Sequence, residues 1–463
     1  MDTSSTIDFP SINPNDDGRR NMAEVASHRR AVDRAASWAS VLAVALGLRL
    51  VAAAAVSWYA RGQGKPCVFA DTVIYWDLAG TIVEGRPYLV SQWGVPHYAL
   101  RTPGYPLFLA ACREVFGVSL PAVRVVQAVL GTLAVWLVAR LVRVTVPGGP
   151  KIGWTVPMMA AGLAAVDPYV VGMSALVLSE AVFVPLMLAG LWGLASFWTT
   201  EGRSGPGRPV VVAILTGLAM GGAILVRPSW ALFVPTILAS WVIGIDRGNR
   251  GKALRAAVIV AMATAAILAP WWARNARVFG RFVPTALWVG ASLYDGISPG
   301  ATGASAMEFV DAPGVRALGE SEQDAVFRDR SLAFAREHPG RVLGLALAKL
   351  GRFWSPWPNA DTLRSPRVAV ASAMVTLPVF ALVAVGLWDR RRDARALVLL
   401  AGPLAYFCLL HLVFVSSIRF RIPGMVPAMG LAAVGLGRLR GRIGESGFSG
   451  RWKRGTGLRG RDS

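Results

Sequence analysis

Long apolar segments separated by short polar links dominate the chain from residue 37 onward. A helix needs about 20 mostly apolar residues to cross a bilayer, and ten segments meet or approach that length. They are residues 37–58, 121–141, 153–173, 176–198, 209–227, 229–245, 255–273, 367–388, 396–416 and 420–437. The pattern therefore predicts an all-α, polytopic membrane protein of about ten transmembrane helices.

Two links, residues 59–120 and 274–366, are much longer than the others, and we expect short helices in both. Residues 324–354 of the second link read as a helix interrupted near Pro339, with leucines alternating with basic residues such as Lys349. This composition fits a helix lying in the lipid headgroup layer. It fits a helix packed inside an extracytoplasmic cap equally well, so both interpretations stay open.

Basic residues alternate along the chain in a way that sets the orientation. Placing residues 1–36 in the cytoplasm makes every second link cytoplasmic, and each of those links is basic, as the positive-inside rule requires. The basic positions are Arg140, Arg143 and Lys151; Arg203 and Arg208; Arg247, Arg250, Lys252 and Arg255; Arg390, Arg391, Arg392 and Arg395; and the tail from Arg438. The sequence thus predicts a disordered cytoplasmic tail (1–36), a transmembrane domain (37–437) with both long links outside, and a basic cytoplasmic tail (438–463).

Composition supports a membrane protein and argues against nucleic-acid binding. Of the 463 residues, 54% are hydrophobic and only 16% are charged, and the mean hydropathy is +0.48. The net charge of +21 would suit a nucleic-acid partner, but the basic residues lie in short links and tails. The scarcity of lysine among the basic residues favours a bacterial source. Three cysteines and four histidines show no metal-ligand spacing, and a divalent metal held by carboxylates remains open.

The first long link contains the residues that carry the most chemistry. Asp71, Tyr75, Leu78 and Ile82 recur at spacings of three and four, which predicts a short amphipathic helix with Asp71 near its start. Asp71 is then either the N-cap of that helix or a functional carboxylate. Asp77 lies off the Asp71 face, and we expect a structural role for it.

Several ionisable residues lie where the bilayer makes them costly, at about 2.5–3.5 kcal/mol each in a span. Arg49 lies inside the first span, and Asp167 and Glu180 lie at the outer ends of the third and fourth. Outer-side arginines run against the positive-inside trend; they are Arg227, Arg274, Arg419 and Arg421. Guanidinium groups match phosphate oxygens, so these positions indicate an anionic ligand. Pairing with lipid headgroups or with Asp167 and Glu180 is the alternative.

An ordered set of short motifs resembles the C-type superfamily of membrane glycosyltransferases, which includes protein O-mannosyltransferases and lipid A aminoarabinose transferases. The matching positions are Arg49; Asp71 with Tyr75, Ala79 and Gly85; residues 101–110 (RTPGYPLFLA); Asp167 and Pro168; Leu178, Ser179 and Glu180; Gly217 to Arg227 and Pro228; Pro270 and Trp271 with Arg274, Asn275 and Gly280; and Arg419, Phe420, Arg421 and Pro423. Each motif is weak alone, whereas their order is specific for the superfamily.

The resemblance implies transfer of a sugar from a polyprenyl-phosphate donor to an acceptor hydroxyl at the outer membrane face, usually with inversion. An aspartate of the first outer loop acts as general base there, which is Asp71 by position. Thr72 after Asp71, and Arg101-Thr102 in place of an acidic-basic pair, depart from the family pattern and argue against the aminoarabinose reaction.

From these patterns we predict a hexosyl or pentosyl transferase of the bacterial plasma membrane, with Asp71 as base. The predicted donor-phosphate residues are Arg101, Arg227, Arg274, Arg419 and Arg421. The predicted acceptor-binding or supporting residues are Asp167, Glu180, Tyr75 and Tyr105. The expected partners are the polyprenyl-phosphate sugar, membrane lipid and an acceptor protein, glycolipid or wall polymer. A lipid-linked sugar transporter or flippase, and a polymerase or ligase of polyprenyl-diphosphate oligosaccharides, are the alternative classes.

Overall fold

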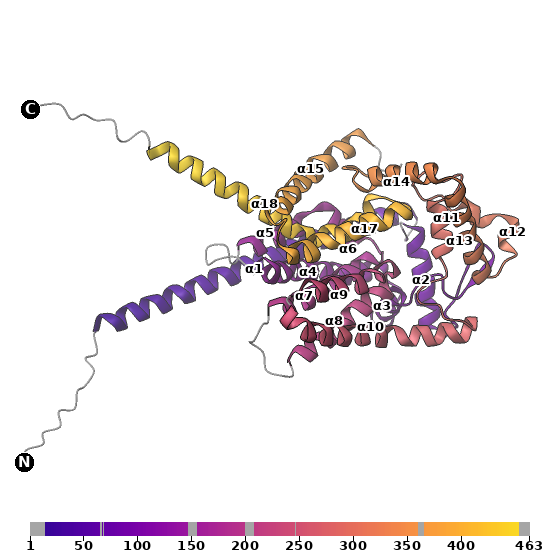
Figure 1. Cartoon of the computed structure of the whole chain (residues 1–463), viewed down its shortest axis with the longest axis horizontal. Helices are drawn as coiled ribbons and strands as arrows, with labels where there is room; N and C mark the ends of the chain where they lie inside the picture. Colours follow the sequence, from indigo (N-terminus) through magenta and orange to yellow (C-terminus); the bar gives the residue numbers. More distant parts are fainter. Residues whose placement is uncertain are drawn as a thin grey trace, which may run out of the picture.

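A bundle of long apolar helices forms the body of the molecule (Figure 1). The computed structural model describes residues 14–64, 67, 69–146, 155–199, 208–245, 247–359 and 365–452. Within these ranges eight helical segments are long and apolar enough to span a membrane. They are Ala35–Gly62, Leu120–Thr145, Glu180–Phe197, Pro209–Val226, Arg247–Phe279, Pro366–Asp389, Ala394–Val413 and Ile418–Arg440. The predicted all-α, polytopic membrane fold is confirmed.

The segments belong to elements that are labelled here as in Figure 1. They are α1 (Pro14–Gly62), α4 (Leu120–Thr145), α7 (Glu180–Thr199), α8 (Arg208–Val226), η2 (Arg247–Asn249), α10 (Arg250–Phe279), α15 (Pro366–Asp389), α16 (Ala394–Ala396), η5 (Leu397–Ala401), α17 (Gly402–Val413) and α18 (Ile418–Trp452).

Two of the ten predicted spans have a different form. The third is a pair, α5 (Thr155–Val166) and α6 (Pro168–Ala175), bent by 57°. Pro168 causes the break because it lacks a backbone N–H and disfavours helical geometry in the residue before it. The sixth is shorter than a span, with η1 (Pro228–Trp230) followed by α9 (Phe233–Gly244).

Small residues let the spanning helices approach closely, as membrane helices generally require. A Cβ atom at Gly217 of α8 would lie 2.4 Å from the carbonyl oxygen of Val260 in α10. A Cβ atom at Gly386 of α15 would lie 1.9 Å from the carbonyl oxygen of Leu431 in α18. Glycine is therefore required at both crossings, where side chains would separate the helices.

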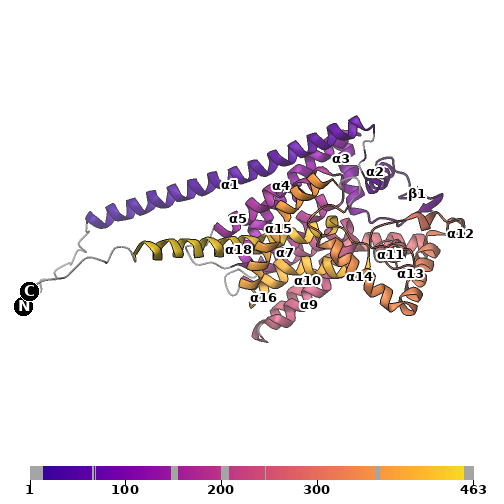
Figure 2. The same ribbon diagram turned by 90° about the horizontal axis from the view of Figure 1, so that it is seen from above.

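The two long links gather at one end of the bundle, away from the first turns of α1 and the last turns of α18 (Figures 1 and 2). Their elements are α2 (Ala70–Val83), β1 (Val90–Gln92), β2 (Val95–His97), α3 (Gly104–Phe116), α11 (Val289–Gly296), η3 (Glu308–Asp311), α12 (Pro313–Arg316), α13 (Glu320–Glu337) and α14 (Pro339–Phe353). The strands form an antiparallel hairpin in which Val90 lies opposite His97.

Hydrogen bonds fasten the two links to each other. The Glu320 carboxylate accepts from the backbone N–H groups of Tyr98 (2.7 Å) and Ala99 (3.0 Å). Within the second link, the Asp324 carboxylate accepts from the N–H of Gly290 at 2.7 Å, which connects α13 to α11. The second link thus fixes the segment of the first link that leads into the Arg101–Tyr105 turn.

The terminal helices extend beyond the predicted spans. Helix α1 begins at Pro14 and α18 ends at Trp452, so helix covers part of both predicted cytoplasmic tails. A formed span provides the nucleus from which helix propagates cheaply into flanking residues. Residues 1–13 and 453–463 of those tails, and the basic positions Lys151 and Arg203, lie outside the described residues.

Candidate active site

Asp71 lies in the first turn of α2 and points into a group of arginines. The N-cap of α2 is Phe69, which makes no side-chain cap. One carboxylate oxygen of Asp71, Oδ1, accepts from Nη2 of Arg101 at 3.1 Å, and the other, Oδ2, accepts from Nη1 of Arg419 at 2.9 Å. The side chain is one-third exposed. Asp71 is therefore an ion-pairing carboxylate at the helix start rather than its N-cap.

Arg101 reaches Asp71 because the turn before α3 packs tightly against α8. A Cβ atom at Gly104 would lie 2.6–2.7 Å from backbone atoms of Leu225 and Val226, so only glycine allows this approach. Arg101 also lies 5.9 Å from the ring centroids of Tyr75 and Trp288, within cation–π range.

Glu180 begins α7, and its side chain is completely buried. Its Oε1 atom lies 2.7 Å from Nη1 of Arg227 at the end of α8, and 2.6 Å from Nε of Arg419. Its Oε2 atom accepts from Nη2 of Arg419 at 3.3 Å. Arg419, at the start of α18, thus bridges Glu180 to Asp71.

These contacts define an ionic cluster of five residues from distant parts of the chain: Asp71, Arg101, Glu180, Arg227 and Arg419. Three guanidinium groups face two carboxylates, which leaves one excess positive charge. Burial raises the pKa of Asp71, but Arg101 and Arg419 outweigh burial and hold it well below its usual range. Burial lowers the pKa of Arg101, but Asp71 reverses that effect and raises it. Asp71 and Arg101 are therefore both charged at neutral pH. The excess of guanidinium groups over carboxylates in the cluster suits an anionic ligand.

Two tyrosines form an aromatic wall beside the ionic cluster. The rings of Tyr75 and Tyr105 meet edge to face at 4.9 Å. The Tyr105 hydroxyl accepts from Nε2 of Gln127 at 3.0 Å and is fully buried. Burial raises the pKa of both tyrosines, so both stay neutral. They supply shape and neutral hydroxyl groups to the wall.

Three predicted site residues lie outside the ionic cluster and bind backbone instead. Arg274 donates to the carbonyl oxygens of Tyr98 (2.7 Å) and Tyr88 (2.8 Å). Arg421 donates to the carbonyl oxygens of Phe353 and Ser355. Asp167 is the N-cap of α6, where its carboxylate accepts from the N–H groups of Tyr169 and Val170 at 3.0 Å. Arg274 and Arg421 thereby order the links around the cluster.

Arg49 is fully buried and stabilises the bend between α5 and α6. It donates to the carbonyl oxygens of Ala164 (3.1 Å) and Ala165 (3.2 Å), the last turn of α5, and of Ala45 (2.9 Å). A helix end inside the membrane leaves carbonyl groups without partners. Arg49 supplies hydrogen-bond donors to these carbonyl groups, which accounts for a charged residue in the first span.

Sequence reasoning missed an aromatic stack next to the ionic cluster. Trp93, in the hairpin turn, has a positive φ of 51° and stacks on Trp288 with centroids 5.1 Å apart and planes 7° apart. His97 meets both rings edge to face at 6.0 Å. The stack stabilises a backbone conformation that is uncommon for a non-glycine residue. The cluster of aromatic residues around the hairpin is the sequence signal for it.

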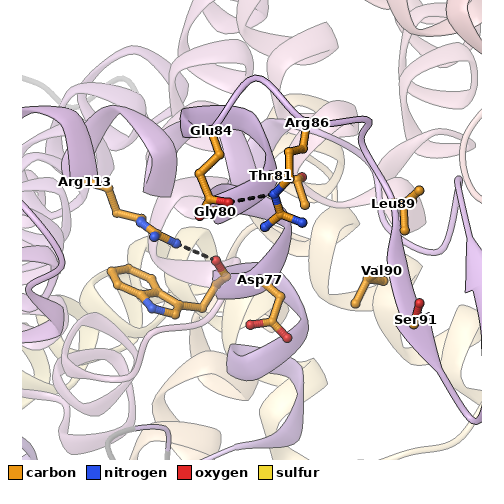
Figure 3. A pocket seen from close by; sticks show the side chains of 10 residues that line it. Asp77, Gly80, Thr81, Glu84, Arg86, Leu89, Val90, Ser91 and Arg113 are labelled. Atoms are coloured by element: carbon orange, nitrogen blue, oxygen red, sulfur yellow. Dashed lines mark hydrogen bonds and ion pairs between the residues drawn. The ribbon is translucent and has the colours of Figure 1, made fainter.

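A cavity of about 450 Å³ lies on another part of α2 (Figure 3). Asp77, Glu84, Arg86 and Arg113 are among the residues that line it. Arg113 also donates to the carbonyl oxygen of Trp76 at 3.1 Å. Asp77 therefore belongs to this separate cavity, as its position off the Asp71 face predicts.

No group of three or more His, Cys, Asp or Glu side chains that could hold a metal occurs among the residues the structure describes. Asp71 and Glu180 are the two carboxylates of the ionic cluster, and arginine side chains contact their oxygen atoms.

Part of the chain matches a known family. Residues 100–273 match the family described as dolichyl-phosphate-mannose-protein mannosyltransferase. Curated proteins give no significant match to the chain.

Solved structures of an archaeal oligosaccharyltransferase share the fold. The archaeal oligosaccharyltransferase AglB from Archaeoglobus fulgidus, in complex with an inhibitory peptide and a dolichol-phosphate, superposes with a TM-score of 0.55 at 14% identity, covering 92% of this chain and 52% of AglB. Its apo form gives the same score and identity with 92% and 53% coverage. ArnT from Cupriavidus metallidurans bound to undecaprenyl phosphate gives a TM-score of 0.44 at 14% identity, covering 86% of this chain and 77% of ArnT. The chain spans about half the length of AglB.

The family match over residues 100–273 and the fold shared with AglB both agree with the resemblance to the C-type superfamily of membrane glycosyltransferases.

Proposed function

We propose that this protein transfers a hexose or pentose from a polyprenyl-phosphate donor to an acceptor hydroxyl, with inversion and with Asp71 as general base. The observation that carries the proposal is the ionic cluster itself. Segments up to 348 residues apart in sequence bring one carboxylate that is one-third exposed and three arginines together. Such an assembly at the end of a membrane bundle suits a charged headgroup carried by a lipid.

The chemistry needs few groups because a sugar phosphate is already an activated donor. A base must take the proton of the acceptor hydroxyl, and cations must stabilise the leaving phosphate. In this proposal Asp71 is the base, and Arg101, Arg227 and Arg419 bind the phosphate. Glu180 holds Arg227 and Arg419 in place.

The remaining predicted residues support the site in this proposal. Tyr75 and Tyr105 form the wall against which the acceptor or the sugar packs. Arg274, Arg421 and Asp167 act at a distance, since their contacts order the backbone of the links and of the α5–α6 bend.

We further propose that the site faces the outside of a bacterial plasma membrane, with both termini in the cytoplasm. One support is the position of α2, α3 and α11 to α14 at one end of the bundle, while the first turns of α1 and the last turns of α18 lie at the other end (Figure 2). The second support is that the basic links lie on the opposite side from the cluster. The acceptor is a protein, a glycolipid or a wall polymer.

The decisive experiment offers purified protein two kinds of donor: polyprenyl-phosphate sugars and polyprenyl-diphosphate oligosaccharides. Consumption of the monophosphate donor supports the proposal, whereas consumption of the diphosphate alone indicates a polymerase or ligase. Movement of the intact donor from one leaflet of a vesicle membrane to the other, without sugar transfer, indicates a flippase. Loss of activity in a chelator, restored by a divalent ion, would add a metal to the site.

Replacement of the base provides the matched test. Asp71→Asn should reduce sugar transfer by at least about 100-fold, the usual contribution of a general base, with normal expression and membrane insertion. Asp77→Asn, six residues further along the same helix and in the separate cavity, serves as control and should keep its activity. A fully active Asp71→Asn variant would remove Asp71 from the role of base.

A further inference from the structure

Both carboxylate oxygens of Asp71 are engaged by arginine. Oδ1 accepts from Arg101 and Oδ2 from Arg419. A carboxylate that two guanidinium groups neutralise is a weak base, because both partners favour its charged form. The resting site therefore holds its proposed base in a form that is poorly suited to take a proton.

The geometry of Arg419 separates a fixed part from an exchangeable part. Its Nε and Nη2 atoms bind Glu180, whose side chain is fully buried, while Nη1 contacts Asp71 at 2.9 Å. Among the residues the structure describes, Arg101 has one carboxylate partner, Asp71 at 3.1 Å, and its side chain is 19% exposed. The contacts to Asp71 thus lie on the more exposed side of the cluster, and the contacts to Glu180 lie on the buried side.

The charge of the cluster determines what can enter it. Arg101, Arg227 and Arg419 contribute three positive charges, and Asp71 and Glu180 contribute two negative charges. One bound phosphodiester, which carries a single negative charge, brings the total to zero. The same guanidinium groups that bind Asp71 are the ones available to such a phosphate.

We propose that Arg101 and Arg419 exchange their contacts with Asp71 for contacts with the donor phosphate when the donor binds. Asp71 then becomes a free base only in the donor complex. This inference rests on the proposed function and adds an order to it, since donor must bind before the acceptor is activated.

Charge stays balanced through the chemical step. The acceptor oxygen forms a bond to the anomeric carbon and passes its proton to Asp71, while the bond from the anomeric carbon to the phosphate oxygen breaks and its electron pair leaves with the phosphate. Asp71 loses one negative charge as the phosphate, now a monoester, approaches two. Three arginines still face three negative charges, so no net charge builds up in a low-dielectric site.

The charge of the cluster also distinguishes between a monophosphate and a diphosphate link in the donor. A diphosphate-linked donor begins with two negative charges and would leave the cluster with one excess negative charge, both before and after transfer. The cluster is therefore matched to a monophosphate link.

The test measures whether Asp71 becomes protonatable when phosphate binds, and it does not depend on sugar transfer. The full chain in detergent near pH 6 is treated with dicyclohexylcarbodiimide, which modifies protonated carboxyl groups, and modification of Asp71 is followed by peptide mass spectrometry. The groups that face Asp71 are Arg101, Arg419 and Tyr75, with Glu180 reached through Arg419. Three probes are compared: geranylgeranyl phosphate, geranylgeranyl diphosphate and uncharged geranylgeraniol.

Geranylgeranyl phosphate should raise modification of Asp71 by about tenfold, the change that one pKa unit produces. Geranylgeraniol should leave it unchanged, and geranylgeranyl diphosphate should act more weakly than the monophosphate. Arg419→Gln without any probe should resemble the wild type with geranylgeranyl phosphate, and Arg101→Lys provides a milder variant if Arg419→Gln fails to fold. Arg316→Gln, which breaks an exposed pair with Asp311 outside the cluster, is the control and should match the wild type.

The outcomes separate this inference from the proposed function. Geranylgeranyl phosphate that binds, shown by quenching of tryptophan fluorescence, but leaves Asp71 modification unchanged or lowers it, would overturn the exchange while the transferase proposal stands. Failure of every polyprenyl-phosphate sugar to react in the donor assay would overturn the proposed function itself. Equal effects of the monophosphate and the diphosphate would overturn the charge match.

Discussion

At the scale of single residues, the site depends on which side chain supplies charge to which partner. Arg419 contacts both carboxylates of the ionic cluster, whereas Arg274 and Arg421 donate hydrogen bonds to backbone carbonyl oxygens. All three carry the same guanidinium group in similar outer-side motifs. The difference lies in whether a carboxylate or a carbonyl is within reach, which their own sequence positions do not reveal.

Removal of the buried carboxylate tests the foundation of the cluster. Glu180→Gln keeps the shape but leaves Arg227 and Arg419 facing each other without their common partner. Breaking a buried ion pair in this way costs about 3–5 kcal/mol, so the variant should melt at lower temperature in detergent and lose activity. Glu84→Gln, which breaks an exposed pair with Arg86, is the control and should leave the melting temperature nearly unchanged. A melting temperature of Glu180→Gln equal to that of wild type would contradict the assigned role.

At the scale of elements, breaks in helices and the contacts that cap them position the site. The bend between α5 and α6 is stabilised by Arg49, and Gly131 of α4 makes room for it. A Cβ atom at Gly131 would lie 2.2 Å from Oγ of Ser174 and 2.7 Å from Nε of Arg49. The glycine is needed for packing and not for backbone freedom.

A pair of glycine variants tests this packing. Gly131→Ala should lower the melting temperature, because Arg49 and Ser174 must both move away from the new methyl group. Gly162→Ala in α5, where a Cβ atom meets nothing within 4 Å, should be neutral or stabilise by up to about 1 kcal/mol through helix propensity. Thermal melts in the same detergent compare the two, and equal effects would refute the close approach at Gly131.

Helix α14 has one buried face and one exposed face, an arrangement that fits both interpretations of its sequence. One face packs on the bundle through Leu345, Lys349 and Phe353, which are buried, while Leu343 and Leu347 on the other face are 63% and 61% exposed. Nζ of Lys349 donates to the carbonyl oxygens of Leu412 (3.1 Å) and Val413 (2.7 Å) at the end of α17. The helix thereby fixes the short connection that leads into Arg419.

The anchor at Lys349 predicts a pH dependence. Burial lowers the pKa of Lys349 to about 8, against a smaller opposing effect of Asp295, while an unfolded lysine titrates near 10.4. Between these values the unfolded chain binds more protons, so stability should rise as the pH increases from about 8 to about 10, by about 1–3 kcal/mol. Thermal melts over this range should show the rise in wild type and a weaker one in Lys349→Met. An identical rise in both would assign the effect to other groups.

At the scale of the whole molecule, the arrangement separates a basic end from an end that carries the site. Substituted cysteines in a variant without Cys67, Cys112 and Cys408 test the proposed orientation. In intact cells, a membrane-impermeant maleimide should label Ser91→Cys in β1, whereas Arg392→Cys between α15 and α16 should react only after permeabilisation. The reverse pattern would place the ionic cluster on the cytoplasmic side.

The sequence alone determined the class of fold, because a span needs a long apolar segment and basic links mark one side of the bilayer. It could not tell that the third span is bent or that residues 229–245 form a shorter helix, since apolar composition is the same in either form. The ordered motifs carried the resemblance to the superfamily and singled out Asp71 and the outer-side arginines.

Only the tertiary structure decided how those residues are used. Asp71 and Arg419 are 348 residues apart in sequence and 2.9 Å apart in space, and no periodicity or spacing encodes such a contact. Packing of α2, the turn before α3, α7, α8 and α18 selects three arginines for the ionic cluster and assigns Arg274 and Arg421 to backbone. Asp71, which the sequence left between helix cap and functional carboxylate, is thereby placed in the cluster, because folding brings two guanidinium groups to its two oxygens.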